Sequence, residues 1–332
     1  MMNVEIMWKE GYKDDNKLPS IGTQMIEFWD YDEGSLRPWR VSANFIYSFK
    51  QNGQDRILRI VPDSERTVKQ ILAELDFMNH LRKQGLPILE PLLSKKNEEI
   101  ESGKNENGLF HAVAYDRAPG RNIEFEDLNE KQWLECGRMM ARLHNASLKF
   151  KPYPKRKRRT WKDDINIDIQ KLPEDDVELK KILLHLQKLI EKIPKGEFYG
   201  LIHYDLCYDN IIWNSDSYVI IDLDDAAYYP FAADIAFGID DVREQPPEKG
   251  EQILNWFSTG YKEIKQLPAD WKEQLNLFYD LEDSLKYART LHAYHGTDPD
   301  QYPEWLVKLK QRHIKYMKGN KEKLIAKWNE IL

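Results

Sequence analysis

The stretch Gly200–Asp225 constrains this chain most, because polar residues interrupt short apolar runs at fixed intervals in it. It reads G-L-I-H-Y-D-L-C-Y-D-N-I-I-W-N-S-D-S-Y-V-I-I-D-L-D-D. His203 is followed by Asp205 after two positions and by Asn210 five further on. Apolar residues on both sides of a polar turn then predict two strands, the second ending at Asp222.

This layout, H-x-D-x-x-x-x-N followed by a hairpin and an Asp at a strand end, is typical of phosphoryl transfer. Asp205 would accept the proton of an attacking hydroxyl. Asn210 and Asp222 are hard oxygen ligands, suited to Mg²⁺ on nucleotide phosphates. His203 is predicted to be structural and to tie the loop to the start of the second strand. The alternative is that Asp and Asn are ordinary turn residues, but the full spacing favours catalysis.

The N-terminal part of the chain predicts a small sheet. Residues up to about 37 show no clear period, and strand signals begin at Trp39. The pair Asn52-Gly53 predicts a hairpin turn before the strand 56–61. In that strand, alternation places Arg59 on the face opposite Leu58 and Ile60.

A carboxylate inside a predicted helix is expected to pair with a cation of this strand. The helix is expected from about Ser64 to Gln84, and Glu74 lies within its apolar stripe. Because a buried carboxylate needs a cationic partner, Arg59 is the candidate. The alternative leaves Arg59 facing solvent and Glu74 at the edge of the stripe.

A boundary between two lobes is predicted at Pro119-Gly120, where the chain reverses after a strand near 110–114. The expected lobes are residues 1–118, which would bind the nucleotide, and 119–332, which would carry catalysis and the acceptor. The backbone at Asp116 and Ala118 is then placed to hydrogen-bond an adenine edge. The preceding segment, Lys95 to Asn107, is predicted to be a charged loop.

The second half contains polar residues with less specific patterns. Asn129 is predicted to cap a helix whose inner face includes His144, interpreted as a core histidine rather than a ligand. The basic run 155–159 is interpreted as a solvated loop. Asp234 is expected either to cap a helix or to bond back to the catalytic loop.

Composition excludes several classes. A net charge of −7 argues against nucleic acid as the main partner. The two cysteines, Cys136 and Cys207, have no metal-ligand spacing and suit a reducing cytoplasm. The first residues lack the pattern of a signal peptide, and no apolar run approaches membrane-spanning length. A cytoplasmic protein without a membrane partner is expected.

On these residues the chain resembles the aminoglycoside phosphotransferase and choline-kinase-like family, within the protein-kinase-like fold. The resemblance covers about Asn44 to Phe237 and rests on N-F-I-Y, L-R-I, A-P-G, A-R-L-H, H-Y-D-L-C-Y-D-N, I-D-L-D-D and A-D-I-A-F. It implies an α+β fold with two lobes. The N-lobe would be a small antiparallel β-sheet plus one helix, and the C-lobe larger and mainly helical.

The resemblance also implies roles and cofactors. Asp205 would be the catalytic base, Asn210 a catalytic residue and, with Asp222, a ligand of Mg²⁺. Arg59 and Glu74 would position the phosphates of ATP, as a Lys and a Glu do in protein kinases. The turn near Ser42 would cover the phosphates.

Two residues depart from the family pattern. Tyr204 stands where Gly usually follows the His, and Cys207 stands where His or Gly is more usual. The bulk of Tyr204 lies next to the expected base. Its side chain is therefore a candidate for restricting the acceptor.

The leading interpretation is an ATP- and Mg²⁺-dependent kinase for a hydroxyl of a small molecule. One alternative is a protein Ser/Thr kinase, although the segment 222–234 is too short for a long peptide-docking loop. Another is an aminoglycoside-type antibiotic kinase, with Asp240, Asp241, Glu282 and Asp283 as an acidic acceptor wall. A third is a non-catalytic relative resembling spore-coat proteins, against which the retained motif argues.

Overall fold

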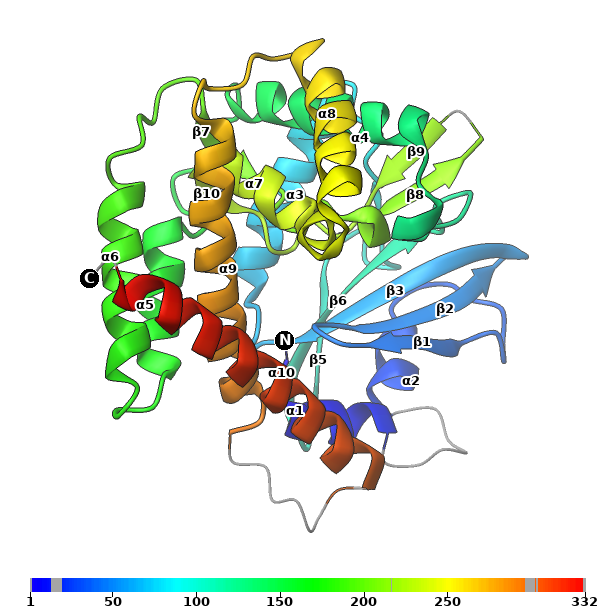
Figure 1. The fold of residues 1–332 in the computed structure, drawn as a ribbon. Coiled ribbons are helices and arrows are strands. Elements are labelled where there is room, and N and C mark those ends of the chain that lie inside the picture. The colour runs from blue at the N-terminus through cyan, green and yellow to red at the C-terminus, as the bar shows by residue number, and fades with distance from the viewer. Residues whose placement is uncertain (1, 13–19, 216, 296–301, 303, 331–332) are drawn as a thin grey trace. The chain divides into compact units, whose positions relative to one another are not determined.

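The structure is a computed structural model that describes residues 2–12, 20–215, 217–295, 302 and 304–330. Contacts divide the chain into two units, coloured along the sequence in Figure 1. The first unit consists of Met1–Leu75, Leu89–Ala118 and Arg289–Tyr316. The second unit consists of Asp76–Ile88, Pro119–Ala288 and Met317–Leu332. The division of roles expected between residues 1–118 and 119–332 stays a prediction.

The first unit is built on an antiparallel sheet. Its described residues form six strands in the order β1-β2-β3-β6-β4, with β5 paired to β6. The strands are β1 (Arg37–Val41), β2 (Phe45–Gln51), β3 (Gln54–Pro62), β4 (Pro91–Leu92), β5 (Glu101–Asn105) and β6 (Gly108–Asp116). Asn52 and Gly53 have φ values of 53° and 76°, the left-handed conformation that the predicted Asn-Gly turn requires.

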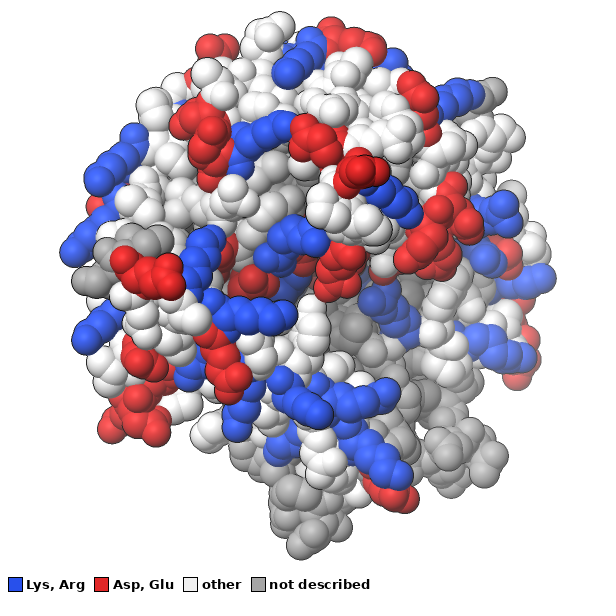
Figure 2. Space-filling view, viewed as in Figure 1, with Lys and Arg blue, Asp and Glu red and all other residues white. Residues whose placement is uncertain are grey.

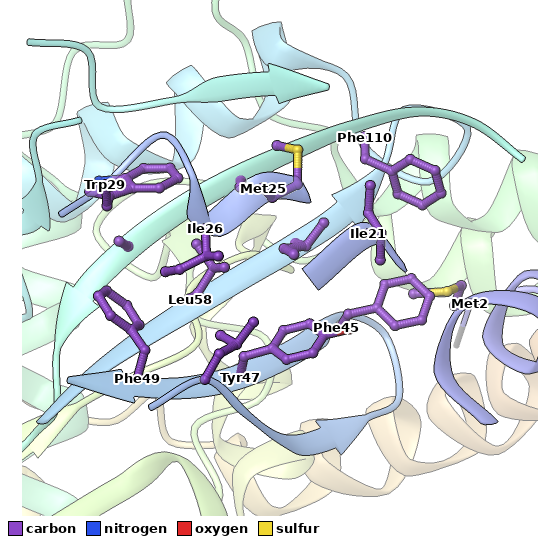
Figure 3. Close-up of a cluster of buried hydrophobic side chains, with 14 residues drawn as sticks. Met2, Ile21, Met25, Ile26, Trp29, Phe45, Tyr47, Phe49, Leu58 and Phe110 are labelled. Carbon is purple, nitrogen blue, oxygen red and sulfur yellow. The ribbon is translucent and has the colours of Figure 1, made fainter. Parts of the chain in front are cut away.

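One face of this sheet packs against helix α2 (Ser20–Ile26). Figure 3 shows Met25 and Ile26 of α2 together with aromatic and aliphatic side chains of the strands, Leu58 among them. Leu58 and Ile60 are fully buried in this cluster, so alternation places Arg59 on the opposite face, as predicted. The N-terminal segment also forms helix α1 (Val4–Met7) and a π-helical turn, η1 (Trp8–Tyr12), which its irregular sequence did not indicate.

Two sequence predictions are corrected in this region. The segment 95–107, predicted as a charged loop, contains strand β5, and Glu101 points inward because its carboxylate accepts a hydrogen bond from Ser94 Oγ at 2.7 Å. Helix α3 (Val68–Lys83) begins later than the predicted start near Ser64. The Thr67 backbone N–H donates to Gln70 Oε1 at 2.9 Å, and this cap fixes the start.

The second unit is mainly helical. Its α-helices are α4 (Glu130–Ser147), α5 (Trp161–Lys171), α6 (Val177–Ile190), α7 (Phe231–Gly238), α8 (Pro247–Lys262) and most of α9 (Trp271–Ala293), and the last turns of α10 (Glu304–Asn329) join them. Three short 3₁₀ turns are η2 (Phe125–Asp127), η3 (Tyr208–Asn210) and η4 (Asp240–Glu244). The predicted capping box of Asn129 and Gln132 starts α4. None of the helices in the described ranges is both long and apolar enough to cross a bilayer.

Two small antiparallel strand pairs interrupt these helices. Strand β7 (Tyr199–Ile202) pairs with β10 (Ala227–Pro230), and β8 (Ile211–Asn214) forms a hairpin with β9 (Ser217–Ile220). The hairpin is the one that the sequence predicts. The loop between β7 and β8, residues 203–210, is called the catalytic loop below.

Candidate active site

Asp205 and Asn210 lie in the catalytic loop and are hydrogen-bonded to each other. Asn210 Nδ2 donates to the Asp205 carboxylate at 3.0 Å and to the Asp205 carbonyl oxygen at 2.8 Å. Asn210 is buried, whereas Asp205 is exposed. Because the amide nitrogen faces Asp205, the amide oxygen is the atom that Asn210 can offer to a cation.

Asp222 is anchored to the same loop through the residue before it. The Ile221 backbone N–H donates to the Asn210 carbonyl oxygen at 3.1 Å, and His203 Nε2 lies 3.0 Å from the Ile221 carbonyl oxygen. The structural role predicted for His203 is therefore confirmed, although its contact lies just after the end of β9 and not at its start. Asp222 has a φ of 64°, a conformation that Asp tolerates better than most residues.

Asp234 binds the backbone of the catalytic loop. This fully buried carboxylate accepts hydrogen bonds from the N–H groups of His203 at 3.1 Å and Tyr204 at 2.8 Å. Of the two roles predicted for Asp234, the bond back to the loop is the one observed.

Asp234 also reaches His144, which is completely buried in α4. His144 Nε2 lies 3.0 Å from Asp234 Oδ2, and Nδ1 lies 2.7 Å from the Tyr261 hydroxyl. The His144 ring stacks on Phe231 with the centroids 4.0 Å apart. Burial lowers the pKa of His144, and Asp234 partly offsets this. The interpretation as a core histidine is confirmed.

The surroundings of Asp205 raise the pKa of its carboxyl. Although the residue reaches solvent, neighbouring protein desolvates the carboxylate, and the charge of Asp225 acts in the same direction. His203 and hydrogen bonds from Cys207 and Asn210 oppose the increase. A carboxylate with a raised pKa is a stronger base, which suits proton abstraction near neutral pH.

In the first unit, Arg59 and Glu74 form the predicted ion pair. Arg59 Nη1 and Nη2 donate to the two oxygens of Glu74 at 2.7 and 2.9 Å, a bidentate geometry. Both residues are buried, and the guanidinium lies 5.8 Å from the centre of the Tyr115 ring. The ion pair is confirmed, whereas its action on a phosphate stays a prediction.

The other residues expected at the nucleotide lie at strand ends of the same unit. Ser42 follows β1, and its N–H donates to the Asn44 carbonyl oxygen at 3.1 Å. Asp116 ends β6, and its carboxylate forms an ion pair with Arg56 at 2.6 Å. Ala118 follows two residues later. The binding of an adenine edge by the backbone of Asp116 and Ala118 stays a prediction.

The prediction of a solvated loop for the basic run 155–159 is wrong for its last two residues. Arg158 is buried and donates to the carbonyl oxygens of Ala226, at 2.7 Å, and Asp224. Arg159 reaches Asp225 at 3.3 Å. A usable signal was T-x-x-D at Thr160, which starts α5 with a capping box and so orders the chain just before it.

Tyr204 has a φ of 82°, a left-handed conformation that favours the glycine usual at this position. Its ring packs against Tyr229 and Phe237, with centroid distances of 5.5 and 5.0 Å. Such backbone strain costs about 1–2 kcal/mol, and aromatic pairs of this kind contribute about 0.5–1.5 kcal/mol each. The packing of the ring thus offsets the strain of its backbone.

We expect the variant Tyr204→Gly to be more stable to urea than Tyr204→Ala by about 1 kcal/mol, because Ala keeps the strain and loses the ring. The matched control is Lys157, an exposed loop residue without a positive φ. There the order should reverse, with Ala more stable than Gly by about 0.4–1 kcal/mol. An Ala variant as stable as the Gly variant at position 204 would contradict the strain.

Three of the four acidic residues expected as an acceptor wall, Asp240, Glu282 and Asp283, are paired with cations of the chain. Arg243 binds Asp283 at 3.0 and 3.1 Å and also contacts Asp240. Lys286 lies 2.8 Å from both Asp240 and Glu282. Burial raises the pKa of Glu282 to about 8, and the neighbouring charge of Lys286 opposes this increase.

Acidic and basic side chains also alternate over much of the surface that Figure 2 presents. Arg243 and Lys286 therefore neutralise the expected acidic wall in part. These ion pairs reduce the negative charge that a polycationic acceptor would meet at these residues.

Comparison with known proteins places this site in a family. The model of the phosphotransferase enzyme family matches residues 38–267. Amicoumacin kinase of Bacillus subtilis (strain 168) is 28% identical over 271 residues, which cover 78% of this chain and 81% of that protein.

Two solved structures share the fold. A complex of the amicoumacin kinase hAmiN with AMP-PNP, Ca²⁺ and Ami has a TM-score of 0.79 and 20% identity, and the match covers 96% of both chains. A microcompartment-associated aminopropanol kinase has a TM-score of 0.72 and 21% identity, with 91% of this chain and 94% of that chain covered.

The α+β fold with an antiparallel sheet in its N-terminal part and a mainly helical remainder is thereby confirmed as kinase-like. The family model covers more than half of the 332 residues and includes the catalytic loop, Arg59 and Glu74. The chain belongs to the phosphotransferase enzyme family and is an enzyme of the kinase type.

Proposed function

We propose that this protein transfers the γ-phosphoryl group of ATP to a hydroxyl of a small molecule, with Mg²⁺ as cofactor and Asp205 as the base. The observation that carries the proposal is the bonding within residues 203–222. Asn210 donates a hydrogen bond to the Asp205 carboxylate at 3.0 Å. Ile221, the residue before Asp222, is bonded to both His203 and Asn210. A base and two oxygen ligands are thus fixed on one short piece of chain.

The donor set fits a magnesium ion. The Asn210 amide oxygen and the Asp222 carboxylate are hard ligands, and Mg²⁺ in such sites takes one or two protein ligands together with substrate phosphates. Among the described residues, no cluster of three or more His, Cys, Asp or Glu is arranged to hold a metal by itself. When bound, the ion would neutralise charge on the transferring phosphoryl group.

The first unit would hold the nucleotide. Glu74 orients the guanidinium of Arg59 through two hydrogen bonds, which suits Arg59 to contact phosphate oxygens. The turn at Ser42 would cover the phosphates, and the backbone of Asp116 and Ala118 would bind the adenine. The relative named above was solved with AMP-PNP and Ca²⁺, which supports a nucleotide with a divalent metal in this family.

During transfer, Asp205 would accept the proton of the acceptor hydroxyl as that oxygen bonds to the γ-phosphorus, while the bond from the γ-phosphorus to the bridging oxygen breaks and ADP leaves. Asn210 keeps the carboxylate oriented through Nδ2, and its amide oxygen would be a ligand of the metal. Asp234 binds the backbone N–H groups of the two residues before the base, and His203 binds the carbonyl oxygen of Ile221 after it, so together they fix the loop. Positioning of this kind supplies most of the catalysis in phosphoryl transfer.

A small acceptor is favoured over the alternatives. The relatives reported above are named for amicoumacin and aminopropanol, both small molecules. The segment between Asp222 and Asp234 is occupied by β10 and the start of α7, which leaves no long loop to dock a peptide. The ion pairs around Arg243 reduce the negative charge available to an aminoglycoside, and the intact loop does not favour a non-catalytic protein.

The test combines binding and turnover. Thermal melting is measured without nucleotide, with Mg²⁺-ATP and with Mg²⁺-GTP, because a ligand that binds only the folded state raises Tm. In parallel, phosphate transfer is assayed to amino sugars, amino alcohols, sugars and a generic protein substrate. We expect a Mg²⁺-dependent increase in Tm with ATP and a hit among the small molecules.

Two results would overturn the proposal. Unchanged melting at saturating Mg²⁺-nucleotide contradicts the nucleotide site. Transfer to the protein substrate alone contradicts the small-molecule acceptor and selects the protein kinase instead.

A further inference from the structure

The last two residues of the basic run lie along the strand that follows the Asp222 region. The Tyr228 backbone N–H donates to the Arg159 carbonyl oxygen at 2.9 Å, and Thr160 forms a parallel bridge with Tyr228 in β10. Arg158 binds the carbonyl oxygens of Asp224 and Ala226, as described above. The backbone of this segment is therefore fixed, and the Arg159 side chain starts from a defined place.

The Arg159 side chain connects three elements. Its Nε donates to Asp164 Oδ1 of α5 at 2.6 Å, and Nη2 donates to Asp225 Oδ1 at 3.3 Å. Its guanidinium carbon lies 5.1 Å from the centre of the Tyr204 ring, within the range of a cation–π contact. Asp164 is itself fixed, since its second oxygen accepts a hydrogen bond from the buried Tyr229 hydroxyl at 2.7 Å.

Two residues that Arg159 contacts, Tyr204 and Asp225, affect the proposed base Asp205. Tyr204 precedes Asp205 and has the strained φ of 82°. Asp225 lies three residues after Asp222, and its charge acts on Asp205. A strained backbone persists only where its surroundings over-determine it. Asp234 fixes the Tyr204 backbone from one side, and Arg159 covers the Tyr204 ring from another.

We propose that Arg159 is a positioning residue for phosphoryl transfer, which holds Tyr204 and Asp225 in place around the base. The proposal rests on the proposed role of Asp205. Arg159 acts through Tyr204 and Asp225, not on the reacting atoms. Its removal should therefore reduce turnover by loosening the loop while leaving the nucleotide affinity unchanged.

The experiment compares Arg159→Leu and Arg159→Lys with Arg156→Leu in the full chain. Arg156 belongs to the same basic run but binds Asp76, at 3.0 and 3.2 Å, and is a matched control away from the loop. The readout is the hydrolysis of Mg²⁺-ATP, in which water takes the place of the acceptor. The kcat and the KM for Mg²⁺-ATP are determined separately.

We expect R159L to lower kcat by about 10- to 100-fold, because small misplacements of catalytic groups have effects of this size. The KM for Mg²⁺-ATP should stay within about threefold for all variants. R159K keeps the charge but not the planar fork, so it should restore part of the rate. R156L should keep kcat within about twofold of wild type, as expected for a surface pair.

A second readout does not depend on activity. The Tm values of R159L, Tyr204→Leu and their double variant form a cycle in which Leu retains the positive φ of Tyr204. Because the two side chains share a contact, the loss in the double variant should be smaller than the sum of the single losses by about 1–2 °C.

The outcomes separate the two proposals. A wild-type protein that neither releases phosphate nor melts higher with Mg²⁺-ATP overturns the proposed function, while the Tm cycle still tests the Arg159 contact. An active wild type with R159L as fast as R156L overturns the positioning role, and so do additive Tm changes. If R159L does not fold, R159K tests the proposal instead. A kcat of R159K within twofold of wild type would contradict a positioning role of the planar Arg159 guanidinium.

Discussion

Substitution of Asp205 by Asn is expected to lower kcat by about 10²–10⁴-fold, the usual contribution of a general base. Asn has the same shape as Asp, and its amide oxygen can still accept the hydrogen bond from Asn210, so the loop should remain folded. It cannot accept the proton of the attacking hydroxyl. The increase in Tm with Mg²⁺-ATP should therefore be the same for variant and wild type, and steady-state transfer to the acceptor measures the loss.

Asp209→Asn is the matched control. Asp209 is an exposed carboxylate in the same loop, and the same change of charge there should leave kcat within about twofold. Equal losses at both positions would show that the loop needs its negative charge rather than a base at 205. Full turnover by Asp205→Asn would remove Asp205 from the mechanism.

Substitution of Asp234 by Ala is expected to lower the free energy of unfolding by about 3–5 kcal/mol, as for other buried charged groups with several partners. The carboxylate is fully buried and accepts from the backbone of His203 and Tyr204, and it also contacts His144. Its loss leaves these three groups without their acceptor and opens a cavity. Urea denaturation monitored by tryptophan fluorescence measures the change.

Asp76→Ala serves as the comparison. Asp76 pairs with the half-exposed Arg156, and loss of such a pair changes stability by only about 0–1 kcal/mol. A similarly small change for Asp234→Ala would mean that water replaces the carboxylate, and that the loop does not depend on it.

The sequence predicts the parts of the site that follow from local spacing. The catalytic loop, its hairpin and the Asn52-Gly53 turn depend on neighbours in the chain, and the structure contains all of them. Arg59 and Glu74 are fifteen residues apart. Strand alternation places Arg59 on the face opposite Leu58 and Ile60, and the helical period places Glu74 in the apolar stripe of its helix, so their ion pair could be inferred.

Other parts depend on contacts that no local pattern contains. Arg159 lies 66 residues from Asp225, and although T-x-x-D at Thr160 indicates an ordered helix start, the basic run does not indicate which residues its last members contact. The strand 101–105 contains Glu, Ser, Gly, Lys and Asn, which rarely favour strands, and it forms because β6 offers an edge for pairing. Tertiary partners overrode local propensity at both places.

The bonds of Ile221 also determine where the proposed base and metal ligands are held together. Asp205, Asn210 and Asp222 belong to one unit and are linked by bonds spanning fewer than twenty residues. Arg59, Glu74 and the hinge belong to the other unit. The spacing of the proposed base and metal ligands is therefore determined by bonds within one unit and does not depend on the other.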